Sequence, residues 1–438
     1  MRTWPTALAW CLTRAFVVTL LCTQEHGVVG DVTYYRESLA AIGAAHPSGT
    51  LTEYPVPALV LLWLPYLLLK AAGHVGGYVT LVATLAVLTD LGFHATLVRT
   101  RRWHGAPRSW LGIPGAEWAW LLAVPALGAT TYARFDLVPG ILVGLAVLYV
   151  VHRPAVAAAV GALATGVKYW PALVLPTLAA PRAGRRRVVV TIAVAGLVLA
   201  VGSLAIGGWH RLWTPLHYQD ERGLQIESVF ATPVMLAWGH GSDAYATSYT
   251  VWKAYDVSGP LVGTLLTLAS VSTLVVALLM AAGWALAWLR IRQASGDASE
   301  ALVWLVLASV GGFMVTNKVL SPQYLLWLLP AAAAGLVVLE RSREGRRRLA
   351  WWTGVLLVAA ALTHEIFPRT YGYLLVHAPG SFWVVDLLAL RNILLVALAA
   401  YAGARAGRLL LRAADETEPT EGVRDGTRRA ARRRRTTA

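Results

Sequence analysis

The chain has 438 residues, of which 57% are hydrophobic and 14% are charged, and its mean hydropathy is +0.57. Soluble domains carry about a quarter charged residues, so this composition excludes an ordinary soluble enzyme, a disordered chain and a secreted disulfide scaffold. A formal charge of +15 would suggest nucleic acid as a partner in a soluble chain. In a membrane protein, Lys and Arg instead report topology, and we expect no nucleic-acid partner.

The first apolar stretch resembles a signal peptide, but Arg14 interrupts it and no clear cleavage site follows. We therefore expect an uncleaved first span. Apolar segments recur along almost the whole chain, and several are shorter than the roughly 20 residues that a full span needs, which predicts kinked, re-entrant or broken helices. The segments cover 6–24, 57–69, 77–98, 116–133, 137–151, 154–168, 170–180, 188–207, 260–289, 301–316, 322–339, 349–364 and 382–404.

Clusters of arginine between these segments set the orientation, because the positive-inside rule places them in the cytoplasm. If 57–69 and 77–98 both crossed the membrane, the cluster that begins at Arg99 would fall outside. We therefore predict that 57–69 dips into the outer leaflet or lies along it. The clusters are Arg99, Arg101, Arg102 and Arg108; Arg182 and Arg185 to Arg187; Arg290 and Arg292; Arg341, Arg343 and Arg346 to Arg348; and the tail from Arg405.

The predicted fold is all-α: a polytopic membrane protein of about twelve transmembrane helices, with a re-entrant or juxtamembrane helix in the first external loop. Residues 1–405 form the transmembrane domain, and 406–438 form a basic, disordered cytoplasmic tail. Both termini are expected in the cytoplasm and the protein in the plasma membrane. No internal repeat is evident, which weakens an inverted-repeat transporter. Most other polar residues lie in the outward connections 25–56, 134–136, 168–170, 208–259, 317–321 and 365–381, which predicts an external polar site.

The first external loop offers a carboxylate at the membrane boundary. Asp31 follows the first span, beside Tyr34, and is either a general base near a lipid-borne substrate or an N-cap of the next helix. Glu53 and Tyr54 precede a Pro-x-Pro entry to the next apolar segment. They are candidates to orient a polar ligand, although prolines at such an entry are also ordinary helix punctuation.

Two short junctions place charges between apolar segments. Arg134 and Asp136 flank one of them, and boundary ion pairs are functional candidates by default, although the two residues could simply satisfy each other. Lys168 precedes a Tyr-Trp-Pro break, which suits a broken helix lining a cavity. A buried lysine needs a carboxylate or phosphate partner, and a lysine that snorkels to the interface is the alternative.

The later connections are also dense in polar groups. One loop contains Arg222, Gln225 and Glu227, which are either site residues or part of a solvated surface. Several aromatic residues lie nearby in the sequence, and they suit either an interfacial belt or sugar stacking. A junction with Lys318, Gln323 and Tyr324 follows, and His364 with Arg369 lies on the last outer connection. A lone histidine is more often structural than catalytic. No zinc-ligand spacing, P-loop or dinucleotide motif is present in the sequence.

The order of these motifs resembles the GT-C superfamily of integral membrane glycosyltransferases. The motifs are Asp31 after the first span, Tyr-Pro-x-Pro at 54–57, Arg-Phe-Asp-Leu-x-Pro at 134–139, Lys-Tyr-x-Pro at 168–171, Leu-Gln-Ile-Glu-Ser at 224–228 and Asn-Lys-Val-Leu-Ser-Pro-Gln-Tyr at 317–324. More closely, the chain is similar to glycosyltransferase family 87, the actinobacterial polyprenyl-phosphate-mannose-dependent mannosyltransferases and their uncharacterised relatives. The resemblance covers residues 5–405.

The resemblance implies transfer of a sugar, mannose first, from a polyprenyl-phosphate donor on the outer face, with inversion and with Asp31 as catalytic base. The acceptor would be a glycolipid or polysaccharide hydroxyl, and membrane lipids are the other partners. Characterised mannosyltransferases carry a His-His pair at the late junction, where this chain has Ser-Pro-Gln-Tyr at 321–324. This departure affects the assignment of mannose more than that of glycosyl transfer. We expect neither a cofactor nor a metal.

Cations near the leaving phosphate would stabilise the transition state. The candidates for this role are Arg134, Lys168, Lys318 and Arg222, and Arg369 is a weaker candidate. The candidates for sugar or acceptor binding are Tyr34, Glu53, Tyr54, Asp136, Gln225, Glu227, Gln323, Tyr324 and His364.

Two rival functions remain at this point: a transporter or lipid flippase, and a non-catalytic membrane scaffold. Transporter sites are expected near the membrane midplane, with repeat symmetry. The polar motifs here cluster on one face, which favours an interfacial enzyme. The discriminating observation is whether Asp31, Arg134, Lys168 and Lys318 converge on one outward cavity.

Overall fold

The computed structural model describes residues 4–43, 49–104, 115–294 and 296–415. Within these ranges the chain is almost entirely helical. Its strands are β1 (Ala246–Tyr249) and β2 (Tyr255–Ser258), which form one antiparallel hairpin in which Ala246 pairs with Ser258, and an isolated bridge joins Gln225 to Asp256. Arg108 and residues 416–438, which belong to the predicted cytoplasmic regions, lie outside the described residues.

Seven helices in the described part of the chain are long and apolar enough to cross a membrane, which indicates a multi-pass membrane protein. The count of twelve spans stays a prediction. The long helices are α1 (Trp4–Thr23), α4 (Tyr78–His104), α9 (Arg185–Gly207), α12 (Val262–Arg290), α13 (Asp297–Thr316), α15 (Arg343–His364) and α16 (Ser381–Asp415). The shorter apolar helices are α3 (Val56–Ala71), α5 (Gly115–Leu127), α6 (Leu137–Tyr149), α7 (Pro154–Val167) and α14 (Leu325–Val338).

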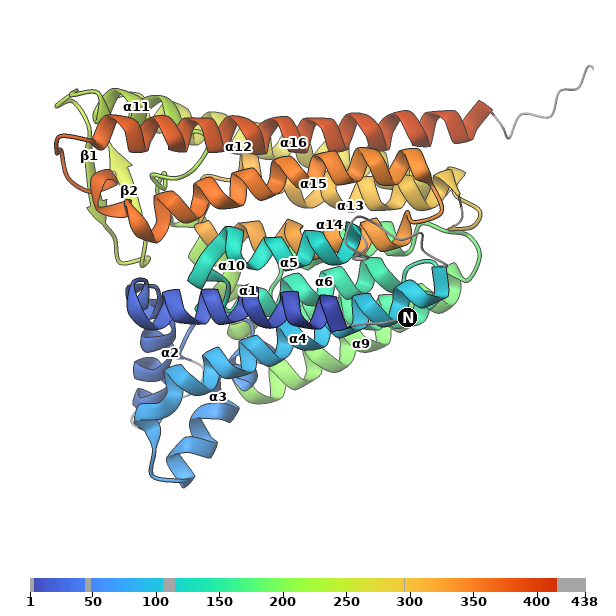
Figure 1. The fold of residues 1–438 in the computed structure, drawn as a ribbon, viewed down its shortest axis with the longest axis horizontal. Helices are drawn as coiled ribbons and strands as arrows, with labels where there is room; N and C mark the ends of the chain where they lie inside the picture. Colours follow the sequence, from blue (N-terminus) through green and yellow to red (C-terminus); the bar gives the residue numbers. More distant parts are fainter. Residues whose placement is uncertain (1–3, 44–48, 105–114, 295, 416–438) are drawn as a thin grey trace, which may run out of the picture.

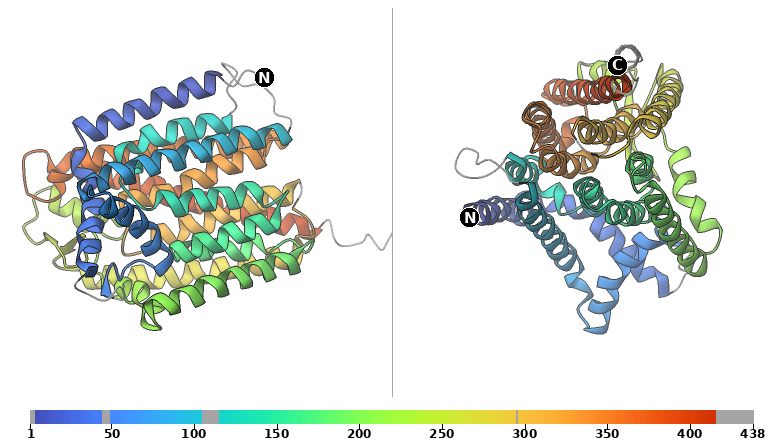
Figure 2. Two further views of the ribbon diagram at one scale, coloured as in Figure 1. Left: turned by 90° about the horizontal axis from the view of Figure 1, so that it is seen from below. Right: turned by 90° about the vertical axis from the view of Figure 1, so that its right-hand side faces the viewer.

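The long helices lie side by side, and the two ends of the bundle differ (Figures 1 and 2). One end, called the loop end, carries α2 (Gly30–Ala40), α3, α11 (Thr232–Gly239) and the hairpin. The opposite end, called the basic end, is where α4 and α16 finish and α15 begins. Two arginine clusters meet there, because the backbone N–H of Arg182 donates to the carbonyl of Ile291 at 3.0 Å.

The core of the bundle is formed by α13, α14 and α6. Every residue of α14 is buried, and α6 packs against it through two glycines. A Cβ at Gly140 would lie 2.1 Å from the Leu326 carbonyl oxygen, so only glycine permits this approach. By contrast, only 6% of the span in α9 is buried, as expected for a helix that faces lipid.

A buried ion pair joins Arg14 of α1 to Asp90 of α4, next to α5. The Nε and Nη2 atoms of Arg14 donate to the two oxygens of Asp90 at 2.8 and 2.9 Å. The indole of Trp120 donates to Asp90 at 2.6 Å, and the hydroxyl of Tyr132 donates to it at 2.8 Å. Arg14 is 2% exposed and Asp90 is 0% exposed. Asp90 thus receives four hydrogen bonds in an apolar setting, where unpaired charges are costly.

Three predictions require correction or refinement. The predicted disorder does not hold for 406–415, because α16 continues to Asp415 through strong helix formers such as Leu409. The connection 208–259 is not one loop, since it holds α10 (His210–Asp220), α11 and the hairpin. The segment 57–69 forms α3, which is not among the seven long spans and lies at the loop end near α2 (Figure 1). Its juxtamembrane placement stays a prediction.

Candidate functional site

A cavity of about 540 Å³ opens among α10, α12 and two broken-helix junctions. Four residues predicted from the sequence line it: Glu53, Lys168, Lys318 and Tyr324. One wall comes from Pro215 and Leu216 of α10 and from Ala269, Ser270 and Thr273 of α12. Leu216 and Ser270 of this wall are exposed, so the lining of the cavity reaches the surface of the molecule.

Lys168 bridges the cavity and a buried carboxylate. It follows α7 in an extended conformation, and its Nζ donates to Asp136 Oδ1 at 2.7 Å. The indole of Trp327 donates to the same oxygen at 2.6 Å. The side chain of Asp136 is 2% exposed and that of Lys168 is 23% exposed. The alternative of a snorkelling Lys168 is therefore wrong, and the ammonium still has donors free to turn toward the cavity.

Lys318 is the second cation at the cavity. Its ammonium donates to the carbonyl of Asp220 at 2.8 Å. Desolvation by burial is the largest influence on Lys318 and lowers its pKa below the usual value. A phosphate in the cavity would oppose this shift, because an anion favours the charged lysine.

Aromatic rings also line the cavity that contains the two lysines. The ring of Trp327 stacks on Trp170 at 4.7 Å between centroids and on Tyr324 at 3.9 Å. Phe313 stacks on Trp327 from farther away, at 6.5 Å. Such an aromatic lining suits a sugar ring or the first isoprene units of a lipid.

Asp31 lies beside this cavity and not in its lining. Its carboxylate is 3.3 Å from Nη1 of Arg134, with side chains that are 39% and 9% exposed respectively. The same Nη1 donates to the Val28 carbonyl at 2.7 Å. The N-cap alternative for Asp31 is wrong, because Val29 is the N-cap of α2 and Asp31 lies in the first turn. A carboxylate is favoured there by the helix dipole.

The tripeptide 134–136 links the two ion pairs. Arg134 contacts Asp31 and Asp136 contacts Lys168, so the alternative in which Arg134 and Asp136 satisfy each other is wrong. Between them, the ring of Phe135 meets Tyr54 edge-on at 5.7 Å. Three of the four predicted charges thus lie on one continuous set of contacts, and two of the four line the cavity.

Tyrosines and Glu53 connect the surroundings of Asp31 with the cavity, since Glu53 lines the cavity and Asp31 is close enough to influence its pKa. The hydroxyls of Tyr35 and Tyr54 are 2.7 Å apart. Desolvation by burial is the main cause that raises the pKa of the Glu53 carboxyl, and the nearby Tyr34 opposes this rise. The negative charge of Asp31 contributes to the raised pKa of Tyr54, after burial and Tyr35, which places the two groups in one electrostatic environment.

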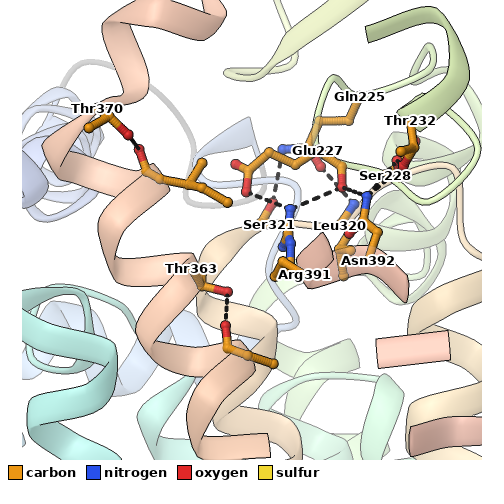
Figure 3. Close-up of polar contacts among 12 residues, drawn as sticks. Gln225, Glu227, Ser228, Thr232, Leu320, Ser321, Thr363, Thr370, Arg391 and Asn392 are labelled. Atoms are coloured by element: carbon orange, nitrogen blue, oxygen red, sulfur yellow. Dashed lines mark hydrogen bonds and ion pairs between the residues drawn. The ribbon is translucent and has the colours of Figure 1, made fainter. Parts of the chain in front are cut away.

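The segment 224–228 is a scaffold and does not line the cavity. The side chain of Gln225 donates to Ser321 Oγ at 3.3 Å and accepts from the Leu320 N–H at 2.7 Å (Figure 3). Glu227 Oε2 is 3.2 Å from Arg391 Nη2, and both side chains are fully buried. Burial raises the pKa of Glu227 to about 7. The predicted direct role of Gln225 and Glu227 in sugar binding does not fit this burial.

The remaining predicted residues are spread around the site. His364 is buried against Glu25 and does not line the cavity, so its predicted role in acceptor binding does not fit its place. Burial raises the pKa of Asp256, and the charge of the half-buried Arg222 partly opposes this rise. Gln323 is half-buried beside Tyr324. Arg369 pairs with Glu365 on the surface at 3.0 Å.

Sequence reasoning missed several residues that the structure joins to the site. Glu25 contacts His364, Arg211 donates to the carbonyls of Thr50 and Leu51, and Arg391 holds Glu227. Glu25 and Arg211 are charged residues at the ends of apolar segments, which was an available signal. Their partners are far away in the sequence and are fixed only by packing.

No protein-family model, no curated protein and no solved structure matches this chain. The assignment of its function therefore depends on the geometry of its own residues.

Proposed function

We propose that the protein is a membrane glycosyltransferase. It moves a sugar from a polyprenyl-phosphate donor to an acceptor hydroxyl of a glycolipid or polysaccharide. Mannose is the first candidate for this sugar. The observation that carries the proposal is a partly exposed carboxylate, Asp31, held by Arg134 beside a 540 Å³ cavity that contains Lys168 and Lys318. A base next to an anion-binding cavity is what inverting transfer from a lipid phosphate requires.

The donor phosphate lies between Lys168 and Lys318, and its lipid leaves between α10 and α12. Both lysines line the cavity, and Leu216 and Ser270 of its wall are exposed. Lysine acts on phosphate as a point charge with several donors. The stacked rings of Trp170, Trp327 and Tyr324 support the sugar or the adjoining isoprene unit.

The reaction is a single displacement at the anomeric carbon. The acceptor oxygen forms a bond to that carbon while the bond to the phosphate oxygen breaks, and Asp31 takes the hydroxyl proton. The electron pair of the broken bond leaves with the polyprenyl phosphate, whose added charge is stabilised by the lysines. The transition state is oxocarbenium-like, as in glycoside cleavage. Arg134 holds the carboxylate in place before transfer.

The proposal is tested with the purified wild-type protein and a panel of polyprenyl-phosphate sugars. Transfer to a glycolipid acceptor, with release of polyprenyl phosphate in equal amount, is the expected result. Movement of a labelled lipid across vesicle membranes, without cleavage of the sugar–phosphate bond, would instead support a flippase.

Lys318→Met is expected to weaken donor binding by about tenfold or more, because a hydrogen bond to a charged group contributes about 1.5–3 kcal/mol. The fold is expected to survive, since the ammonium donates to the carbonyl of Asp220 at an exposed position. KM for the donor is the measurement. The control is Lys70→Met, which removes an exposed lysine at the end of α3, away from the cavity. Equal KM values for the two variants would exclude Lys318 from the donor site.

We further propose that the loop end faces the outside of the plasma membrane, with about twelve spans, a juxtamembrane α3 and both termini in the cytoplasm. A single cysteine at position 101, in a chain whose exposed Cys11 and Cys22 are replaced by Ala, is expected to resist an impermeant thiol reagent applied to intact cells. Lysis should expose it. Labelling of intact cells would place this position outside and make α3 a full span.

A further inference from the structure

A second buried acid lies close to Asp31 in the sequence but outside the cavity. Glu25 is 4% exposed, and its Oε1 is 2.6 Å from Nε2 of His364 at the end of α15. Its other oxygen accepts the backbone N–H of Ala129 at 3.2 Å. Both carboxylate oxygens are therefore occupied, and Glu25 has no open path to act on a substrate.

The backbone of the short helix η6 (Gly128–Thr131) is shaped to admit His364. Gly128 has a φ of +66°, and a Cβ at this position would lie 2.2 Å from Nε2 of His364. A side chain is therefore excluded by both conformation and space. The Glu25–His364 contact depends on this glycine.

The segment from Glu25 to Asp31 is held at both of its ends by the stretch 129–134. The helix η1 (His26–Val29) follows Glu25 directly and leads into α2, which carries Asp31 in its first turn. Ala129 holds Glu25, and Arg134 holds both the Val28 carbonyl and the Asp31 carboxylate. Only five residues separate Glu25 from Asp31 in the sequence, so a movement of the first changes the place of the second.

We propose that Glu25 and His364 are positioning residues for Asp31, an inference that rests on the proposed function of Asp31 as the base. The pair clamps the end of α1 to the end of α15, and η1 transmits that position to α2. Loss of the clamp lets η1 turn and moves the carboxylate away from Arg134 and from the acceptor. Small misplacements of a catalytic group can reduce rates by about 10²-fold.

The first test needs no substrate. Asp31 is modified with a water-soluble carbodiimide, and mass spectrometry of its peptide measures the extent of modification. This extent reports how far Arg134 shields the carboxylate from the reagent. Glu25→Ala and Gly128→Ala are expected to increase this modification several-fold. Glu25→Gln keeps the length and hydrogen-bonding capacity of the side chain, and it is expected to restore most of the wild-type pattern.

The matched control is Glu300→Ala. Glu300 also forms a buried ion pair, 2.8 Å from Arg405 with side chains 3% and 12% exposed, but it lies in the first turn of α13 and pairs with α16. Breaking it is expected to lower stability and to leave the modification of Asp31 unchanged. Equal modification of Asp31 in wild type, Glu25→Ala and Gly128→Ala would overturn the inference, as would an equal increase in Glu300→Ala.

The second test uses transfer. Glu25→Ala is expected to lower kcat by about 10²-fold with KM for the donor little changed, because the donor cations lie elsewhere. In an Asp31→Asn background, Glu25→Ala is expected to cause no further loss, since a residue that acts through Asp31 has nothing left to position. Additive losses would overturn the positioning role. If the wild-type protein transferred no sugar, the proposed function would be refuted. The carbodiimide experiment would still test whether Glu25 and His364 position Asp31.

Discussion

Asp31→Asn is expected to lower sugar transfer by about 10²–10⁴-fold, the usual contribution of a positioned general base. The amide has nearly the same size and keeps an oxygen for Arg134, but it cannot accept the acceptor proton. Asp31 is 39% exposed in the first turn of α2, so its replacement is not expected to prevent folding. The measurement is kcat for transfer from a polyprenyl-phosphate sugar with purified protein of unchanged thermal unfolding midpoint.

The control for this prediction is Glu37→Gln on the same helix. The side chain of Glu37 is 67% exposed, and its closest cation, Arg36, is 3.9 Å away. This variant removes the same charge from α2 without touching Arg134, and its turnover is expected to match that of wild type. Near wild-type turnover in Asp31→Asn would remove Asp31 from the role of base.

The largest effect on stability is expected at the buried pair of Arg14 and Asp90. Asp90→Leu leaves the guanidinium without a counter-charge at a position where Arg14 is 2% exposed. Removing one partner of a buried pair typically costs about 3–5 kcal/mol. It also leaves the indole N–H of Trp120 and the hydroxyl of Tyr132 without their acceptor. Thermal unfolding in detergent is expected to show a much lower midpoint.

The double variant Arg14→Leu, Asp90→Leu separates the charge from the packing. Apolar replacement of a whole buried pair is often neutral, so the double variant is expected to recover most of the loss. A double variant as unstable as Asp90→Leu would mean that the hydrogen bonds of Trp120 and Tyr132, and not the uncompensated arginine, dominate.

Much of the helical arrangement was predictable because hydropathy and arginine clusters are local signals. The apolar stretches 188–207 and 260–289 became α9 and α12, and the clusters at Arg182 and Arg290 meet at one end of the bundle. The helical state of 406–415 was missed because arginine and alanine favour helix as readily as they favour a disordered tail, and α16 simply continues.

The partners of the charged residues could not be read in the same way. Arg134 and Asp136 are two positions apart in the turn between η6 and α6, where the sequence pattern does not fix the direction of either side chain. They turn to different partners, Asp31 and Lys168, which other elements bring from distant parts of the sequence. The same holds for Glu25 and His364, separated by 339 positions. The sequence identified polar residues at the loop end, and packing decides which of them line the cavity.

The proposed lipid path past Leu216 and Ser270, two exposed residues of the cavity wall, has a consequence for how the proposed reaction is measured. A donor that enters past Leu216 and Ser270 arrives by diffusion in the plane of the bilayer and not from bulk water. Its concentration is then a mole fraction in the membrane. Diluting the vesicles with inert lipid at constant total donor is expected to slow transfer, whereas diluting the whole suspension is expected to leave the turnover of each enzyme molecule unchanged.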